Sequence, residues 1–463
     1  MSLRSVTRSA AQLGGGAAAI YATWATLRRL EERTANAKLA VGKRFIILGG
    51  GFAGAAVAQE LARLLPGEDN GEVLLVDQDN YLLFTPMLTE AVGGEVGTRD
   101  IVSPVRSLPR KVSFVQGQIT KIDLQARSVD VKVGTAAMDP TIKTYTGDQL
   151  VIALGSVVNF HDTPGVAENA LTVKRLDDAE RVLQRVSACL ERAAVEDDAD
   201  KRKVLLTFVV GGGGYTGVET MASVNDLVRS MAAKLPRIRS EEVRTLVVEP
   251  GDRLLPEITP ELAAYATKKL KEHGVEVRLQ TRIEGAGADF VTLQGGERIA
   301  TRTFIWTAGV TPSPLLKDLP APKGKHHGLT VNGSCEVPGY PGVWALGDCA
   351  EIPEPDGKGT YAPTAQNATR EGKMVAQNIV KSLRGTPLEV FRFTPIGELA
   401  LVGRHSGVAR VYGRNFSGLL AWAMWRAVYL AKMPGFAQRS RILTDWILDV
   451  VFDRAAIPLS SAE

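Results

Sequence analysis

A glycine-rich turn of one pattern occurs twice in this chain of 463 residues, each time after a short apolar run. The pattern is Gly-x-Gly-x-x-Gly, from Gly49 to Gly54 and again from Gly212 to Gly217. Such glycines permit a tight turn from a strand into a helix and let a pyrophosphate group approach the backbone closely. Two copies in one chain predict two parallel α/β domains, each with its own dinucleotide site.

The residues around the two turns also correspond. Residues 44–48 read as a strand and residues 53–65 as a helix, and a second strand over residues 72–76 ends at Asp77. The later copy has an apolar strand over residues 203–210, a long helical segment, and a strand over residues 243–248 that ends at Glu249. An acid at this place accepts hydrogen bonds from ribose hydroxyls. The sequence therefore indicates an internal duplication of a nucleotide-binding unit.

The acidic residues suggest which nucleotides bind. Glu249 would pair with a ribose 2′-hydroxyl and repel a 2′-phosphate, which favours NADH, although Arg253 leaves NADPH open. Two facing dinucleotide carriers are most simply a bound flavin and a nicotinamide, because hydride passes directly between stacked rings. Glu219, in the first turn of the second helix, is either a surface acid that compensates the helix dipole or a residue facing the nicotinamide end.

Composition excludes several other classes of protein. Lys and Arg number 55 against 51 Asp and Glu without concentrated basic runs, so no nucleic-acid partner is expected. The cysteines Cys189, Cys335 and Cys349 are odd in number and far apart, which favours a reducing compartment. We expect no metal site, since His326-His327 reads as a surface turn without further ligands nearby.

Other segments give a coarser picture. Residues 112–133 alternate like antiparallel strands, and residues 145–154 read as a buried strand. Residues 180–203 are charged and helix-prone, which is typical of a surface helix with a linker. A further helix is expected around residues 369–383.

A third motif resembles a known flavoprotein element. Residues 340–348 form an apolar run that ends in Gly347-Asp348, similar to the second FAD-binding motif of flavoproteins with two dinucleotide-binding domains. The resemblance implies that Asp348 meets the ribityl chain of FAD. Residues 151–155 and 304–309, the latter ending at Gly309, look like the crossover strands of that superfamily.

The absence of a cysteine pair after Asp77 argues against disulfide reductases, and the chain from residue 43 to 454 instead resembles type II NADH dehydrogenases. The resemblance rests on Asp77-x-x-Asn80-Tyr81 running into Phe84-Thr-Pro86, on Gly212 to Glu219, and on residues 365–372. It implies that Gln366 and Thr369 point towards a quinone. The family often has a histidine or another polar residue where this chain has Thr369. Gln366 can hydrogen-bond a quinone carbonyl but cannot protonate it. The alternative is that Gln366 is only a polar residue at a helix start.

The two ends of the chain differ from its middle. Residues 418–430 are nearly all apolar, but Arg426, Lys432 and Pro434 make them too short and too charged to span a bilayer. The next helix is amphipathic and suits the headgroup region, although both helices could equally cap a domain core or a dimer interface. Its apolar face is expected to hold Ile442, Leu443, Trp446, Ile447, Val450 and Val451, with Asp445, Asp449 and Asp453 opposite. The Arg-rich first 40 residues suggest a transit peptide or a membrane-facing extension.

These features together predict an α/β protein with two Rossmann-like doubly wound domains and a C-terminal amphipathic helical region that associates with a membrane. The expected parts are an extension (1–40), an FAD-binding domain (41–165 and 305–395), an NADH-binding domain (166–304) and the tail (396–463). The candidate catalytic residues are Gln366, Thr369 and Glu219. The candidate cofactor-binding residues are Gly49, Gly51, Phe52, Ala53, Gly54, Asp77, Gly212, Gly214, Gly217, Glu249, Gly309, Gly347 and Asp348.

The expected activity is hydride transfer from NADH to FAD and onward transfer of two electrons to a quinone. The alternatives are a sulfide:quinone oxidoreductase, for which Cys335 and Cys349 are the only candidate cysteines near the flavin, and a nicotinamide-sensing protein without turnover. We expect a peripheral membrane protein on the cytoplasmic face of a bacterial inner membrane, with an organelle membrane as the alternative, and a possible homodimer.

Overall fold

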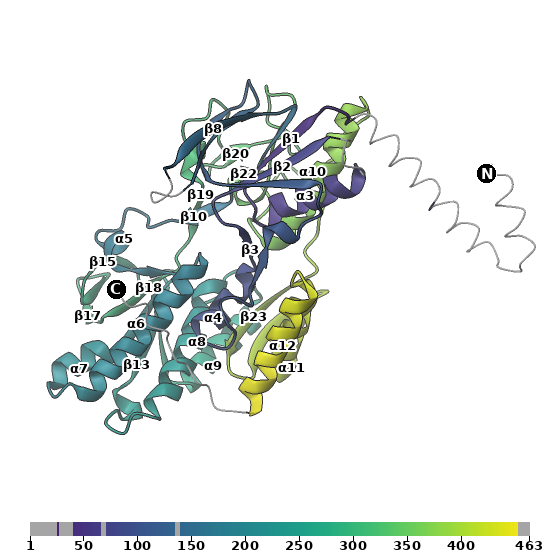
Figure 1. Cartoon of the computed structure of the whole chain (residues 1–463). Coiled ribbons are helices and arrows are strands. Elements are labelled where there is room, and N and C mark those ends of the chain that lie inside the picture. Colours follow the sequence, from purple (N-terminus) through teal and green to yellow (C-terminus); the bar gives the residue numbers. More distant parts are fainter. Residues whose placement is uncertain (1–25, 27–39, 66–70, 135–138, 452–463) are drawn as a thin grey trace, which may run out of the picture. The chain divides into compact units, whose positions relative to one another are not determined.

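Each glycine turn connects the middle strand of a five-stranded parallel sheet to a helix in the computed structural model, which describes residues 26, 40–65, 71–134 and 139–451. The chain divides into two compact units, one of residues 1–82, 104–156 and 312–393, the other of residues 83–103, 157–311 and 394–463. The two sheets and their helices confirm the predicted α/β class with two doubly wound parts (Figure 1). The expected extension lies outside the described residues, apart from Thr26 and Ala40.

The sheet of the first unit has the strand order β21-β9-β1-β2-β5, and every neighbouring pair in it is parallel. Apolar residues fill β1, β2 and β9 almost without interruption, as a sheet covered on both faces requires. Helices α3 and α10 pack against each other. The bounds are β1 Arg44–Leu48, β2 Glu72–Asp77, β5 Val112–Gln116, β9 Gln149–Ile152, β21 Val343–Ala345, α3 Phe52–Leu64 and α10 Ala365–Leu383.

The prediction of antiparallel strands over residues 112–133 was partly wrong. β5 joins the parallel sheet beside β2, and only the strands that follow form an antiparallel sheet, in the order β6-β7-β8. Alternation of exposed and buried residues does not reveal strand direction, and β5 lies at the sheet edge, where a strand is only half covered. The bounds are β6 Gln118–Asp123, β7 Ser128–Val133 and β8 Thr141–Thr146.

The sheet of the second unit repeats the first, with the order β11-β18-β12-β13-β14 and parallel pairing throughout. β12, which leads into the glycine turn, lies in the middle as β1 does. The bounds are β11 Leu171–Thr172, β12 Thr207–Gly211, β13 Arg244–Val248, β14 Val275–Arg278, β18 Thr303–Trp306, α6 Leu176–Val195, α8 Tyr215–Ala232 and α9 Pro260–Glu272.

The predicted strand over residues 203–210 begins too early, because α7 (Ala199–Leu205) takes its first residues. The side chain of Asp198 caps α7 by accepting hydrogen bonds from the N–H groups of Asp200 and Lys201, which starts a helix there. The β-branched run therefore becomes a strand only from Thr207.

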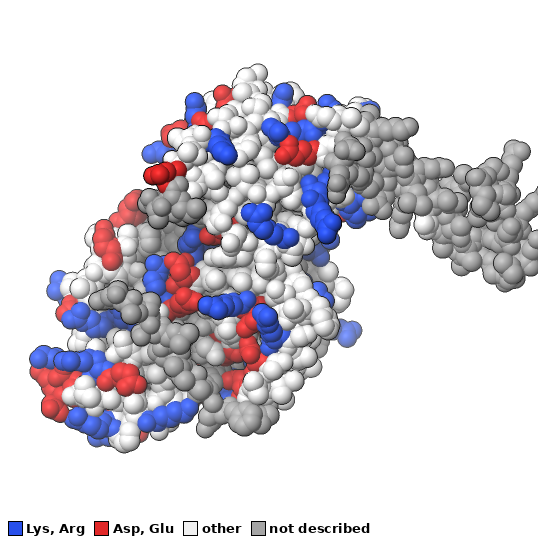
Figure 2. Space-filling model, in the orientation of Figure 1, with Lys and Arg blue, Asp and Glu red and all other residues white. Residues whose placement is uncertain are grey.

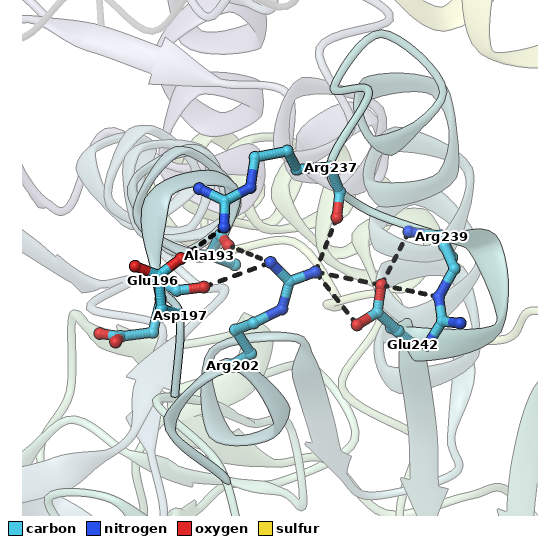
Figure 3. A network of polar contacts seen from close by, with 7 residues as sticks. All are labelled: Ala193, Glu196, Asp197, Arg202, Arg237, Arg239 and Glu242. Carbon is cyan, nitrogen blue, oxygen red and sulfur yellow. Dashed lines mark hydrogen bonds and ion pairs between the residues drawn. The ribbon is translucent and has the colours of Figure 1, made fainter. Parts of the chain in front are cut away.

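A partly buried arginine, Arg202, fixes the segment that was expected to be a linker. Arg202 donates to the carbonyl oxygens of Ala193, Glu196 and Arg237 and to both carboxylate oxygens of Glu242, at 2.7–3.3 Å. Figure 3 shows these bonds converging on one guanidinium from both sides. Because Arg202 connects the end of α6 to α7 and to the short helix at Ser240–Glu242, these elements form one rigid corner of the second unit.

The C-terminal residues form an antiparallel sheet and two adjacent helices, α11 and α12, which are yellow in Figure 1. Within the described residues, none of the helices is both long and apolar enough to cross a membrane. Figure 2 shows acidic and basic side chains intermixed on the face in view. The bounds are β23 Gly397–Gly403, β24 Ser406–Val411, β25 Arg414–Gly418, α11 Leu419–Lys432 and α12 Phe436–Val451.

The faces of α12 differ from the prediction. Ile442 and Trp446 are buried, but Leu443 and Ile447 are 46% and 56% exposed, so the apolar residues divide between an inner and an outer face. Asp449, predicted to lie on the polar side, is buried beside Asp226 and Arg404 in a polar crevice, and its carbonyl oxygen accepts a hydrogen bond from Arg404. The side chains of residues 450–451 and all of residue 453 lie outside the described residues.

The remaining elements are short and connect the larger ones. They are α4 Leu88–Val92, α5 Val166–Asn169, β3 Tyr81–Leu83, β4 Val102–Pro104, β10 Ser156–Val158, β15 Ile283–Gly287, β16 Phe290–Leu293, β17 Arg298–Ala300, β19 Val310–Pro312, β20 Leu329–Thr330 and β22 Ala350–Glu351.

Candidate functional site

The first glycine turn has no room for side chains at two of its three glycines. Gly49 has a φ of +100°, and a Cβ there would lie 2.2 Å from the carbonyl oxygen of Ala153. A Cβ on Gly54 would lie 1.9 Å from the carbonyl oxygen of Gly49. A Cβ on Gly51, by contrast, would meet nothing within 4 Å. The turn is therefore tightly packed behind and open in front, where α3 begins with Phe52 and Ala53.

The second turn repeats this geometry. Gly212 has a φ of +111°, and a Cβ on Gly217 would lie 1.9 Å from the carbonyl oxygen of Gly212. Gly214 again has open space in front of it. Of the described side chains, none caps α3 or α8, and neither first turn contains an acid. Two helix N-termini with neither a capping side chain nor an acid in the first turn fit the pyrophosphate groups of two dinucleotides.

The acid after each second strand holds its own turn. Asp77 accepts hydrogen bonds from the N–H groups of Gly50 and Asp79, and Glu249 accepts from those of Gly213 and Gly251. Burial raises the pKa of Asp77 above its ordinary value. A carboxylate has about four acceptor positions, so each acid keeps capacity for ribose hydroxyls.

Arg253, which left NADPH open at the sequence level, is engaged nearby. Its Nη2 donates to the carbonyl oxygen of Pro256 at 3.1 Å, within the loop after β13. The guanidinium of Arg253 is thus anchored to its own loop.

The Gly-Asp motif directly follows β21. Gly347 has a φ of +71°, and the Oδ2 of Asp348 accepts a hydrogen bond from the Ser156 hydroxyl at 2.6 Å. The N–H of Gly347 donates to Glu371 Oε2 at 2.8 Å. Glu371 is only 2% exposed, and burial raises its pKa to about 7. Glu371 is not among the predicted site residues, since one acid inside a charged helix carries no signal of burial.

The two residues compared with a quinone site lie at the start of α10. Thr364 caps this helix, which begins four residues before the predicted boundary at Thr369. Gln366 and Thr369 are both partly exposed and lie one turn apart. The hydroxyl of Thr369 donates to the carbonyl oxygen of Ala365 at 2.8 Å, so its proton is directed into the helix.

Glu219 is buried, so the interpretation as a surface acid was wrong. Its Oε1 accepts hydrogen bonds from the N–H of Leu401 at 3.0 Å and from the indole Nε1 of Trp425 at 3.1 Å. Burial raises its pKa to about 8. Trp425 lies 206 residues further along the chain, which explains why local pattern could not find the pair.

The cysteines and the remaining candidates are placed as follows. Cys189, Cys335 and Cys349 are free and buried, and burial raises the pKa of Cys349 to about 12. Gly309 has a φ of +110° at the end of the segment that follows β18. His326 and His327 are exposed in a turn. Because burial raises the pKa of all three cysteine thiols, they are in their protonated, unreactive form at neutral pH.

Two dinucleotide turns and a strand that ends in Gly-Asp, all in one chain, define a flavoprotein with two dinucleotide-binding units. The family described as pyridine nucleotide-disulphide oxidoreductase matches residues 43–372, and the NDH2 C-terminal domain matches residues 396–455. The chain therefore belongs to the pyridine nucleotide-disulphide oxidoreductases and, among them, to the type II NADH dehydrogenases. This confirms the resemblance found in the sequence.

Similar proteins agree with this assignment. Demethylphylloquinone reductase NdbB of Synechocystis sp. is 33% identical over 87% of this chain and 95% of its own length. The external alternative NADH-ubiquinone oxidoreductase of Yarrowia lipolytica mitochondria is 28% identical over 89% of this chain and 80% of its own. The structure of NDH2 from Plasmodium falciparum in complex with NADH has a TM-score of 0.83 at 19% identity, covering 90% and 99% of the two chains.

Proposed function

We propose that this chain catalyses the reaction NADH + H⁺ + quinone → NAD⁺ + quinol. The observation that carries the proposal is the pair of glycine turns, each open in front of an uncapped helix, in a chain whose relatives are named for NADH and quinones. When bound, FAD supplies the chemistry, because it accepts hydride from NADH and gives up two electrons to a quinone.

We propose that each glycine turn binds one of the two dinucleotides. The first turn, Asp77 and Asp348 hold FAD, and the second turn and Glu249 hold NADH. We assign the FAD-binding domain to residues 41–165 and 305–395 and the NADH-binding domain to residues 166–304. The tasks of these residues are binding and orientation, since bound carriers that meet in the right geometry need no protein nucleophile.

Gln366 is the proposed quinone contact at the start of α10. Its amide N–H groups are donors of the kind that a quinone carbonyl accepts, and Thr369 directs its own hydroxyl proton to the carbonyl oxygen of Ala365. Glu219 is the second candidate, with a carboxyl that stays protonated to about pH 8.

The outer faces of α11 and α12 support a membrane-surface role. Exposed apolar side chains gather there, and Phe436 reaches 85% exposure. Large exposed apolar side chains on amphipathic helices suit the boundary between headgroups and acyl chains. Arg426, the charge that interrupts the apolar run of residues 418–430, is buried. We propose a peripheral membrane protein on the cytoplasmic face of a bacterial inner membrane, or on an organelle membrane, and a homodimer remains a prediction. The other exposed members of the face are Leu419, Leu420, Leu443, Ile447 and Leu448.

Sulfide oxidation, the alternative on this scaffold, needs reactive cysteines near the flavin. Cys335 and Cys349 are both fully buried, and burial raises the pKa of each thiol. Neither thiol is therefore a good nucleophile for sulfide chemistry.

The test of the proposed reaction is direct. Purified protein should be yellow, and with a short-chain ubiquinone or menaquinone analogue it should oxidise NADH. Colourless protein that stays inactive after FAD is added would end the proposal. NADH oxidation at far below one turnover per second with every quinone would instead favour the nicotinamide-sensing alternative.

A separate experiment tests the membrane face. Replacing Phe436 and Ile447 together by Ser should release the protein from vesicles in flotation and should lower quinone reduction more than reduction of a soluble dye. Val390→Ser is the matched control, because Val390 is 49% exposed but belongs to the other unit. Unchanged flotation of the double variant would contradict a membrane role for these helices.

A further inference from the structure

We propose that α11 is part of the catalytic machinery as well as a membrane-facing helix, because it presents Trp425 as a positioning residue for the buried carboxyl of Glu219. This proposal rests on the role proposed for Glu219 in the reaction.

Glu219 is held by two donors that come from two different elements of the C-terminal region. The N–H of Leu401 comes from β23 and the indole N–H of Trp425 comes from α11, and both reach Oε1. Glu219 and Trp425 are both buried, so water does not replace a lost donor easily. The orientation of this carboxyl therefore depends on how α11 is seated.

The next residue, Arg426, also holds α11 in place, through contacts on another side of the helix. Its guanidinium lies 3.6 Å from Glu90 and 3.5 Å from Glu95 and stacks on the rings of Trp422 and Trp446, with its centre 4.2 and 4.7 Å from theirs. Adjacent residues of an α-helix point about 100° apart, so Trp425 and Arg426 anchor α11 in two directions.

Rotating or sliding α11 would leave buried charges without partners. Arg426 is 7% exposed and Glu90 is fully buried, and the indole N–H of Trp446 donates to Glu90 at 3.2 Å. Removing one partner of a buried ion pair is strongly unfavourable because the other charge stays in a medium of low dielectric. α4, α11 and α12 therefore share one polar core, and Trp425 enters the site from a fixed position.

Several groups act on the carboxyl of Glu219 besides its donors. Burial is the main cause of its raised pKa, Glu95 raises that pKa further by charge repulsion, and the hydrogen-bond donors, Leu401 and Trp425 foremost, lower it by stabilising the anion. Burial likewise raises the pKa of Tyr429 on α11 and of Tyr215 at the start of α8, and repulsion from Glu219 adds to both shifts. With these groups unchanged, loss of the indole donor should raise the pKa of Glu219 further above 8.

The decisive variant is Trp425→Phe, which removes the donor and keeps an aromatic ring. The rate of quinone reduction should depend on pH with an apparent pKa that reflects Glu219. In Trp425→Phe we expect this apparent pKa to rise by about one pH unit, the usual effect of one hydrogen bond to a charged group. Trp344→Phe is the matched control, since it removes a buried indole donor, to Gln149 of the other unit, and touches neither Glu219 nor the partners of Arg426. This control variant should leave the apparent pKa unchanged.

Infrared titration of the folded holoenzyme provides the second readout, with the Glu219 carboxyl band identified by its loss in Glu219→Gln. A band with the same titration midpoint in Trp425→Phe and in the unmodified protein would overturn the proposal. Full activity and an unchanged pH profile in Glu219→Gln would contradict the catalytic role of Glu219 instead, and the infrared midpoint would still test the contact. If Trp425→Phe does not fold, Trp425→His, which offers an imidazole N–H, should retain the original midpoint, and a shifted midpoint there would contradict the proposal.

Discussion

The two glycine turns have the same backbone and differ in the helices that follow them. Both follow the middle strand of a parallel sheet, and both bring the last glycine so close to the first that no Cβ fits. Seven residues after the first glycine, however, α3 has Ala56 and α8 has Glu219. A Cβ on Gly372 of α10 would lie 2.8 Å from the Cβ of Ala56, so α3 is used for close helix packing.

The difference extends to two buried acids, Glu219 and Glu371, whose pKa values burial raises to about 8 and about 7. The second unit carries Glu219 on the helix of the turn itself, whereas the first carries Glu371 on α10, bonded to the N–H of Gly347. The two units thus share the geometry of the nucleotide turn, whereas Glu219 and Glu371 lie on helices that do not correspond. Six substitutions, in four predictions, can break or sharpen this comparison.

Gly54→Ala and Gly217→Ala should have the largest effects, and similar ones. Each new Cβ would lie 1.9 Å from a backbone carbonyl oxygen that the sheet holds in place. We expect each variant to lose about 3 kcal/mol of unfolding free energy or to fail to fold. Thermal or denaturant unfolding measures this loss. A stability loss below about 1 kcal/mol in either variant would show that the backbone of the turn can shift to accommodate the new Cβ.

Gly51→Ala and Gly214→Ala should separate the two sites without unfolding the chain. Each Cβ would point into open space in front of a helix, where the pyrophosphate is expected. Gly51→Ala should therefore be folded but colourless, and Gly214→Ala should be yellow but reduced by NADH at least tenfold less efficiently. Circular dichroism and the flavin absorbance are the measurements. Loss of FAD from Gly214→Ala would reverse the assignment of the two turns.

Glu371→Gln should change how stability depends on pH. The pKa of Glu371 is about 7 in the folded state against an ordinary 4.5, so the folded state binds the proton more tightly. Its contribution to stability is present below about pH 4.5 and is lost as the pH rises to 7, by at most roughly 3 kcal/mol. The variant stays neutral, and its unfolding free energy should decline less between pH 5 and 8. An identical decline in both proteins would contradict the raised pKa of Glu371.

Glu249→Gln should have the smallest effect, because it should change the preference between NADH and NADPH without abolishing activity. Removing the negative charge relieves repulsion of a 2′-phosphate, so the ratio of kcat/KM for NADPH to that for NADH should rise roughly tenfold. Gln keeps one acceptor for the turn N–H groups. Steady-state kinetics with both nucleotides decide the matter, and an unchanged ratio would place ribose recognition on another residue.

The sequence predicted the parts of the site that are local in the chain. The two turns, the acids Asp77 and Glu249 at strand ends, and the Gly347-Asp348 motif each follow from a strand and the few residues after it. The glycines of these turns are a strong sequence signal, because a Cβ at Gly54 or Gly217 would collide with a backbone carbonyl oxygen and a positive φ is costly for other residues.

The contacts that join distant segments could not be predicted in the same way. Glu219 and Trp425, or Arg426 and Glu90, are each separated by more than 200 residues, and nothing in one segment indicates its partner. Periodicity also identified the apolar side of α12 but not which part of it would be covered, so the burial of Asp449 was missed. Residues 83–103 likewise give no sequence signal that they pack in the second unit.

The most direct test of the account is anaerobic rapid mixing of the purified protein, first with NADH and then with a short-chain quinone, while the flavin absorbance is recorded. We predict that NADH bleaches the flavin of the unmodified protein and that the quinone restores the absorbance. In Gly214→Ala, dithionite should bleach the same flavin while NADH does so poorly. A flavin in the unmodified protein that NADH leaves oxidised, or that the quinone leaves bleached, would contradict the account.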